Sequence, residues 1–224
     1  GMGLRYSGFQ QVGPNKIYKT DDDGNRLDSI VYGKGKPVKS YGGLEPRLTL
    51  RYSINDQTSI KASVTRNLQY IHLVSNAGTT LPTDLWVPST YKVKPQISWL
   101  YAAGLFKNFR NNMFETSLEL YYKNMQNQIE YKEGYIQSTI DDVENSFTFG
   151  RGWSYGAELF INKVKGRLTG WIGYTLSWTW RKFPGLNYGN KYPAKYDRRN
   201  DMNVVLIYEL NKKWKLSATF VYGT

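Results

Sequence analysis

Short and long connections alternate along the chain, and this rhythm constrains the fold more than any single motif does. Runs of alternating apolar and polar residues are joined by tight links at 55–57, 110–112, 165–167 and 211–213. Between these links lie long connections at about 8–43, 71–94, 126–147 and 182–198. A soluble β-sandwich has no reason to keep such strict alternation. A barrel that crosses a bilayer has short turns on one rim and long loops on the other.

Period-two patterns mark the strands themselves. In 46–54, Leu48 and Leu50 share one face while Thr49 and Arg51 share the other, which is the signal of a half-buried strand. The same reasoning predicts strands at about 2–8, 46–54, 60–65, 95–108, 112–125, 153–164, 167–181, 200–210 and 213–222. We therefore predict an all-β fold, an antiparallel up-and-down meander of about nine strands that is part of a larger transmembrane β-barrel.

The first long connection, 8–43, has structure of its own in this prediction. Residues 21–25 (Asp-Asp-Asp-Gly-Asn) separate 17–20 from 28–31, and an Asp-Gly step favours a tight turn. We expect a small hairpin inside a long extracellular loop. If the short turns face the periplasm, 75–94, 126–147 and 183–198 are extracellular as well.

Composition agrees with a membrane interface. The chain has 19 Tyr, 7 Trp and 9 Phe, and rings with one apolar and one polar end suit the boundary between lipid and water. The net charge is +12, but the charges fall mostly in turns and loops. This distribution favours solvated turns and attraction to anionic lipid headgroups over a nucleic-acid partner. Cysteine is absent, which excludes disulfides and Cys-based metal sites.

The sequence also predicts that the chain is a piece of a longer protein. It contains no run of 18 apolar residues and therefore no transmembrane helix, and no signal peptide is visible. A barrel needs export, and Gly1-Met2 has the appearance of a remnant of recombinant expression.

Several segments carry a family resemblance. In order they are 43–47 (GLEPR), 81–88 (LPTDLWVP), 120–125 (LYYKNM), 155–159 (YGAEL), 168–177 (LTGWIGYTLS) and 196–201 (YDRRND). In this order and spacing they resemble the C-terminal β-barrel portion of TonB-dependent outer-membrane receptors of the Bacteroidetes type. The resemblance covers about 43–223.

The resemblance implies active import. Receptors of this family bind scarce nutrients at the bacterial surface, among them iron chelates, cobalamin and glycans. An N-terminal plug sits inside a barrel of 22 strands, and the periplasmic TonB protein pulls on a segment ahead of the plug. A surface lipoprotein is a further partner in some cases. The expected location is the bacterial outer membrane, with its lipid as a partner, and no enzymatic activity or cofactor is expected.

The chain departs from the family pattern in two respects. It has no recognisable plug or TonB-contacting segment. It ends in Tyr222-Gly223-Thr224, without the terminal aromatic residue that the family shows. We expect residues 1–224 to be a partial barrel, with the plug and the native C-terminus lying outside it.

No catalytic or metal site is predicted. His72 is the only histidine, and no carboxylates stand at a suggestive spacing from it. A Ser-His-Asp set can be drawn, but no nucleophile elbow accompanies it. The carboxylates of Asp21–Asp23 and of Asp141, Asp142 and Glu144 could ligate calcium, but a solvated turn is the simpler interpretation in both places.

Aromatic and basic residues of the long loops are the candidate ligand-binding residues, because flat rings stack on sugars or planar ligands and cations hold acidic groups. They are Trp86, Tyr91, Tyr188, Tyr192, Tyr196, Lys191 and Lys195. Loop packing and interface anchoring are the alternative role for them. Asp197, Arg198 and Arg199 are predicted to form a charge network in the lumen beside the plug, with a structural ion pair as the alternative.

Two other functional classes stay open from the residues alone. A soluble, basic β-domain could bind carbohydrate or other ligands through aromatic loops, and solubility without detergent would favour it. An outer-membrane hydrolase would need a nucleophile set that one histidine does not supply.

Overall fold

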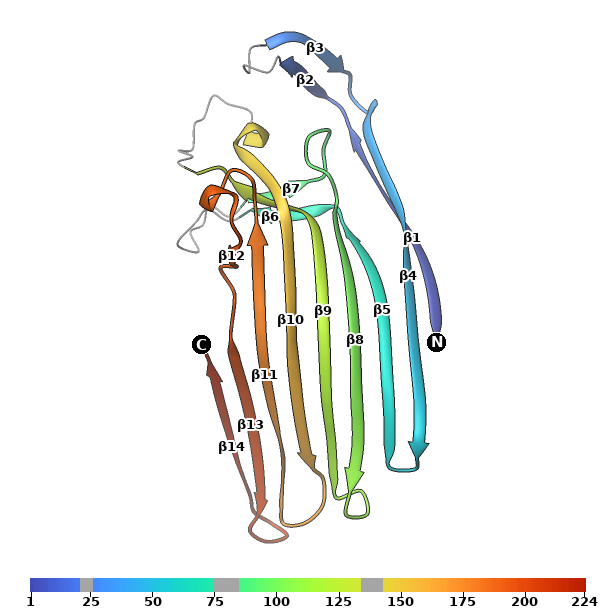
Figure 1. Ribbon diagram of the computed structural model, residues 1–224, viewed down its shortest axis with the longest axis vertical. Helices are drawn as coiled ribbons and strands as arrows, with labels where there is room; N and C mark the ends of the chain where they lie inside the picture. Colours follow the sequence, from blue (N-terminus) through green and yellow to red (C-terminus); the bar gives the residue numbers. More distant parts are fainter. Residues whose placement is uncertain (21–25, 75–84, 134–142) are drawn as a thin grey trace.

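The computed structural model describes residues 1–20, 26–74, 85–133 and 143–224. Its main feature is one curved antiparallel sheet in which nine long strands lie side by side (Figure 1). These strands are β1 (Met2–Val12), β4 (Pro37–Asn55), β5 (Thr58–Gln69), β8 (Gln96–Phe109), β9 (Phe114–Tyr131), β10 (Phe147–Lys163), β11 (Leu168–Lys182), β13 (Asn200–Glu209) and β14 (Lys215–Gly223). Their order follows the chain, so the predicted nine-strand meander is confirmed.

The four tight links are confirmed as turns at one end of the sheet, at the bottom of Figure 1. Residues 110–112 all have positive φ, between 51° and 59°, and Gly166 has φ 101°. Positive φ is least costly for Gly and Asn, which explains why Asn111, Asn112 and Gly166 stand here. We call this end of the sheet the turn end.

Short hairpins occupy the opposite end, which we call the loop end (Figure 1). Strands β2 (Asn15–Thr20) and β3 (Arg26–Tyr32) pair with each other, as do β6 (Ile71–Val74) and β7 (Leu85–Pro88). The two-residue strand β12 (Tyr192–Pro193) joins β11. Two 3-10 turns, η1 (Val143–Ser146) and η2 (Asn187–Gly189), complete the connections.

The connection predicted at 8–43 is shorter than expected, because β1 and β4 stay paired up to Val12 and Pro37. Strands β2 and β3 project beyond them as a hairpin, while the turn predicted at 21–25 lies outside the described residues. The pair β6 and β7 was not predicted. The residues of β6 alternate in burial and Val87 of β7 is buried, within a segment that the sequence assigned to a loop.

Buried side chains gather at the loop end. Val74, Val87, Val93, Ile129 and Phe147 form the hydrophobic cluster, with Tyr131 and Phe149 packed against it. These residues come from β6, β7, the top of β9 and β10, and the connection before β8. We call this cluster the cap core.

No helix within the described ranges is long and apolar enough to cross a membrane.

Candidate functional site

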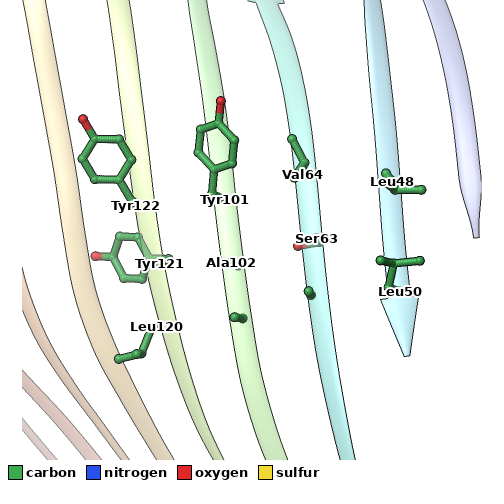
Figure 2. Close-up of a pocket in the computed structure, with 11 residues that line it drawn as sticks. Leu48, Leu50, Ser63, Val64, Tyr101, Ala102, Leu120, Tyr121 and Tyr122 are labelled. Atoms are coloured by element: carbon green, nitrogen blue, oxygen red, sulfur yellow. The ribbon is translucent and has the colours of Figure 1, made fainter. Parts of the chain in front are cut away.

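One face of the sheet is apolar. Cross-strand pairing aligns Leu105 with Leu118 and Leu118 with Leu159, and all three side chains are exposed. Figure 2 shows part of this face, where Leu48 and Leu120 flank a shallow hollow of about 400 Å³. A contiguous apolar surface of this kind is unfavourable in water and is the surface that a membrane barrel turns toward lipid. We call it the outer face.

Aromatic side chains lie toward both ends of the outer face. Near the loop end, Tyr101 pairs with Tyr122, and both hydroxyls point toward that end (Figure 2). Near the turn end, Phe109 pairs with Phe114. The segment 114–122 between them fits the roughly 9–11 residues that a tilted strand needs to cross the hydrocarbon layer. Two aromatic belts with an apolar band between them are typical of a strand wall in a bilayer.

The opposite face, which we call the inner face, carries charged side chains in one cross-strand row that is interrupted by a single glycine. Arg51 pairs with Lys61, Lys61 with Gly104, Gly104 with Glu119, and Glu119 with Glu158. The row is therefore basic on β4 and β5 and acidic on β9 and β10. Charges of this kind need water or polar partners, which a barrel lumen supplies and lipid does not.

Gly104 makes room for one of the two facing carboxylates. A Cβ at Gly104 would lie 2.7 Å from Cγ of Glu119, so the Glu119 side chain extends over the glycine toward β8. Two carboxylates directly opposite on paired strands repel each other. By extending over Gly104, Glu119 leans away from Glu158 and toward the strand that carries Lys61.

A polar recess of about 480 Å³ lies against β5, β8 and β9, between the charged row and the loop end. Its lining is rich in amides and includes two cations: Arg5, Asn67, Gln69, Gln96, Ser98, Lys123 and Gln128, with Leu68, Ile97 and Met125. Gln128 is buried, and its Nε2 donates to Oε1 of Gln96 at 3.1 Å. Amide groups that donate and accept, beside a cation, can bind an oxygen-rich anionic solute.

A buried carboxylate fixes one side of this recess. Glu45 is fully buried and accepts hydrogen bonds from the Arg5 guanidinium and the Ser7 hydroxyl. The Tyr70 hydroxyl in turn donates to the Ser7 carbonyl at 3.0 Å. Because a buried charge is tolerated only when it is paired, this network holds Arg5 at the edge of the recess.

The predicted aromatic loop residues lie at the loop end, but they do not converge on one recess. Trp86, Tyr188 and Tyr196 are exposed, Tyr188 completely. Tyr91 lines a small recess of about 110 Å³ whose lining includes none of the other six predicted residues. The Lys39 ammonium lies 5.7 Å from the ring centres of both Tyr41 and Tyr91.

Tyr192 is engaged with the protein itself. Its hydroxyl lies 3.4 Å from Oε2 of Glu130, the same atom to which Arg181 donates at 2.8 Å. Burial, with the Glu130 carboxylate as the next cause, raises the pKa of the Tyr192 phenol to about 12. The two predicted lysines also lie over rings, Lys191 at 4.8 Å from Trp180 and Lys195 at 5.5 Å from Tyr196.

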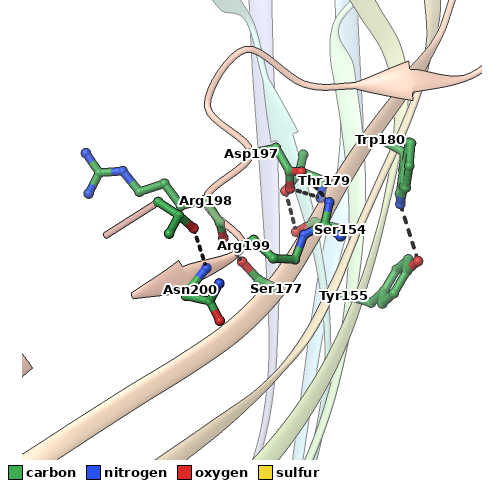
Figure 3. A network of polar contacts seen from close by, with 10 residues as sticks. Ser154, Tyr155, Ser177, Thr179, Trp180, Asp197, Arg198, Arg199 and Asn200 are labelled. Carbon is green, nitrogen blue, oxygen red and sulfur yellow. Dashed lines mark hydrogen bonds and ion pairs between the residues drawn. The ribbon is translucent and has the colours of Figure 1, made fainter. Parts of the chain in front are cut away.

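Asp197 and Arg199 form a local network at the start of β13 (Figure 3). The Arg199 guanidinium donates to Oδ2 of Asp197 at 2.9 Å, and the backbone N–H of Thr179 donates to Oδ1 at 2.6 Å. Arg198 is instead 3.5 Å from Asp201 and well exposed. The network fastens the connection after β12 to β11, and its predicted contact with a plug stays a prediction.

His72 is fully buried in β6, which the sequence did not indicate. Its Nε2 lies 3.0 Å from the Ser89 hydroxyl, and its Nδ1 has no hydrogen-bond partner among the described residues. Burial lowers the pKa of the imidazole, which favours the neutral form. In the described ranges no three His, Asp or Glu side chains lie close enough to hold a metal ion. The carboxylates Asp21–Asp23, Asp141 and Asp142 lie outside those ranges.

The polar recess was not predicted, because its residues come from strand ends that are distant in the chain. Gln69, Gln96 and Gln128 stand at or near the loop-side ends of β5, β8 and β9. The available signal was the recurrence of polar amides at these strand ends.

The sequence matches the family model for TonB-dependent receptor-like β-barrels over residues 1–223. No curated protein sequence matches the chain.

Three solved structures illustrate the similarity of fold. The FrpB iron transporter from Neisseria meningitidis has a TM-score of 0.59 and 13% identity, covering 97% of this chain and 29% of its own. The ferric-catecholate import receptor Fiu from E. coli K12 has a TM-score of 0.56 and 13% sequence identity. The match covers 84% of this chain and 26% of the Fiu chain. The ferripyoverdine receptor of the Pseudomonas aeruginosa outer membrane has a TM-score of 0.55 and 13% sequence identity. The match covers 89% of this chain and 27% of the receptor chain. The chain thus spans less than a third of each of these three proteins.

Proposed function

Because this chain belongs to the TonB-dependent receptor-like β-barrel family, we propose that it forms part of the wall of a receptor that imports a scarce nutrient across the bacterial outer membrane. The observation that carries the proposal is the sheet with one lipid-compatible and one polar, charged face. A wall of this kind separates lipid from an aqueous lumen. The proposed role is transport and not catalysis.

For the nutrient we propose an anionic, oxygen-rich iron chelate, in preference to cobalamin or a glycan. The polar recess supports this choice, because it combines several amides with the Lys123 ammonium. The three solved structures with the same fold, an iron transporter and receptors for ferric chelates, point the same way. The seven aromatic and basic loop residues would make the first contact with the solute before it reaches the recess.

The proposal implies the TonB protein as a partner. The TonB protein would supply the energy through a plug that packs against the charged row on the inner face. There, Glu119 and Glu158 offer carboxylates to basic plug side chains, and Arg51 and Lys61 offer cations to acidic ones. A surface lipoprotein that helps to capture the nutrient and the Bacteroidetes-type origin both stay predictions.

The proposal is tested by ligand binding to the complete receptor in detergent. We expect an iron chelate to bind, and Lys123→Gln to weaken it by about 10- to 100-fold, because a hydrogen bond to a charged group contributes about 1.5–3 kcal/mol. Lys213→Gln removes the same charge from a turn at the opposite end and should leave affinity unchanged. Binding of oligosaccharides but of no iron chelate would contradict the iron proposal. Equal losses in both variants would contradict the role of the recess.

A further inference from the structure

A second recess, of about 620 Å³, opens on the outer face above the aromatic belt, where β9, β10 and β11 approach the loop end. It is lined by Gln126, Asn127, Phe149, Gly150, Arg151, Trp153, Lys182 and Pro184. Arg151, Trp153 and Tyr155 stand two residues apart along β10, so their side chains share one face of the sheet. The polar recess and the charged row lie on the inner face, and this recess shares no residue with them.

A β-bulge shapes the recess. The register between β9 and β10 shifts at Gly150/Arg151, and Asn127 on β9 is the residue left over, with φ 54°. Its side chain is held by the Pro95 carbonyl at 2.8 Å. A bulge bends its strand and redirects the neighbouring side chains, and bulges are common at the rims of barrels.

The neighbouring glycine is required by close packing. A Cβ at Gly150 would lie 2.3 Å from the Lys182 carbonyl oxygen and 2.6 Å from the Phe183 ring. The backbone of β10 therefore approaches β11 closely here, which places Arg151 directly opposite Lys182.

Arg151 and Lys182 form an uncompensated pair of cations. They are cross-strand partners, both are exposed, and neither forms an ion pair within the part of the chain that the structure describes. Two like charges directly opposite on paired strands destabilise the sheet unless an anion lies between them. Guanidinium and ammonium groups both bind phosphate in proteins, the guanidinium through two parallel hydrogen bonds and the ammonium as a compact charge.

The surface toward the membrane from these cations is aromatic. Two further cations lie near its rings, the Lys191 ammonium at 4.8 Å from the Trp180 ring centre and the Arg199 guanidinium at 5.0 Å from that of Trp178. Trp153 pairs with Trp180, and Tyr155 pairs with Trp178 and stacks on its ring at 5.5 Å. The apolar rows of the outer face continue below them toward the turn end. A ligand whose charged group lies between Arg151 and Lys182 would therefore rest its remaining part on rings and then on leucines.

We propose that this recess binds the phosphate headgroup of an anionic outer-leaflet lipid, whose acyl chains lie along the apolar rows. The choice of leaflet rests on the proposed orientation, with the loop end outside the cell. Charge complementarity selects an anion, and the adjoining apolar rows select an acylated one over free phosphate. The bound lipid would neutralise the Arg151–Lys182 pair and fasten the loop end to the membrane surface.

Lipid binding to the complete receptor in detergent tests the proposal, with native mass spectrometry counting bound molecules. The probes are lipid A with its two phosphates, the same lipid after dephosphorylation, and inorganic phosphate. We expect the double variant Arg151→Gln/Lys182→Gln to bind phosphorylated lipid A roughly 30-fold more weakly than the unmodified receptor does. The reason is that each cation removed near a membrane surface lowers the affinity about fivefold. Dephosphorylated lipid A should bind both proteins equally weakly.

The matched control is Lys212→Gln/Lys213→Gln, which removes the same charge from the turn between β13 and β14 and should leave affinity unchanged. Equal affinity of the Arg151/Lys182 variant and the unmodified receptor overturns the proposal, and so does an equal loss in both variants. Full displacement of the lipid by millimolar inorganic phosphate overturns the role of the acyl chains. Chelate binding, measured on the same samples, separates the two hypotheses, since its absence contradicts the iron-chelate proposal and leaves the lipid result intact.

Discussion

The loop end and the strand wall of this protein are stabilised in different ways. At the loop end, Val93 and Phe147 are almost fully buried by the chain's own residues, and so is His72. In the wall, Leu50 and Leu120 are 60% and 57% exposed, and Leu118 is 47% exposed. The same chain therefore contains one region with a hydrophobic core and one region without any.

The difference shows that the surroundings, and not the chain, complete the wall. Its backbone groups are paired from strand to strand, but its apolar side chains gain nothing from folding until lipid covers them. Among the described residues, the outermost strands β1 and β14 also have one unpaired edge each. Cap and wall should accordingly respond to different substitutions.

The largest expected effect is on the cap. Phe147→Ala removes a buried ring that packs edge-on against Tyr131, with 5.3 Å between ring centres. Loss of a buried Phe side chain costs about 3–5 kcal/mol. Hydrogen exchange at the amides of β6 and β7, measured on the complete receptor, should speed up accordingly, because these strands close the cap core.

Phe109→Ala is the control for that experiment. Phe109 lies on the outer face at the turn end, far along β8 from the cap, and is exposed. Lipid chains can fill the space that its ring leaves, and exchange in β6 and β7 should not change. If Phe109→Ala accelerated this exchange as much as Phe147→Ala, cap and wall would be one cooperative unit and the comparison would fail.

The second largest expected effect is the cost of a charge on the outer face of the wall compared with the inner face. Leu118→Arg places a charge midway between the aromatic belts on the outer face, which costs about 2–4 kcal/mol at the bilayer midplane. Ser117→Arg, one residue earlier on β9, points to the inner face and should cost much less. Denaturant unfolding in lipid vesicles measures both. Equal costs would mean that the two faces do not differ in their exposure to lipid.

The wall could be predicted from the sequence because its determinants are local. Alternation along 46–54 or 112–125 fixes which side chains share a face, and the Asn-rich links fix where strands reverse. In such a meander each strand pairs with the next strand of the wall, so order and register follow. The charged row on the inner face is the sum of several local patterns placed side by side by that register.

The cap could not be predicted in the same way, because its determinants are distant in sequence. Strands β6 and β7 are four residues each, too short for a reliable period. His72 is hydrogen-bonded to Ser89, 17 residues later, and its strand β6 contacts β9, which is distant in the chain. The polar recess and the Arg151–Lys182 pair likewise need the register and the bulge, which no single segment encodes.

The smallest expected effect is a pH dependence confined to the cap. The pKa of His72 is lowered from its ordinary value of 6.5 because burial disfavours the cation, and Nδ1 has no acceptor among the described residues. The opened cap therefore binds a proton as pH falls through 6.5, while the closed cap resists it. The contribution of neutral His72 to the free energy of cap closure is therefore fully present above pH 6.5. It decreases as the pH falls below 6.5 and stops decreasing below the lowered pKa.

The ring resonances of His72 in the receptor, assigned with His72→Gln, give its titration midpoint directly, and we expect it below 6.5. Acid should also make β6 and β7 more sensitive to protease at pH 5 than at pH 8, and His72→Gln should remove this difference because glutamine does not titrate. The wall has no histidine in this chain and should show no matching change. A midpoint at or above 6.5 would mean that His72 is solvated or paired with an anion. In that case the cap would not be the dry, self-contained core that distinguishes it from the wall.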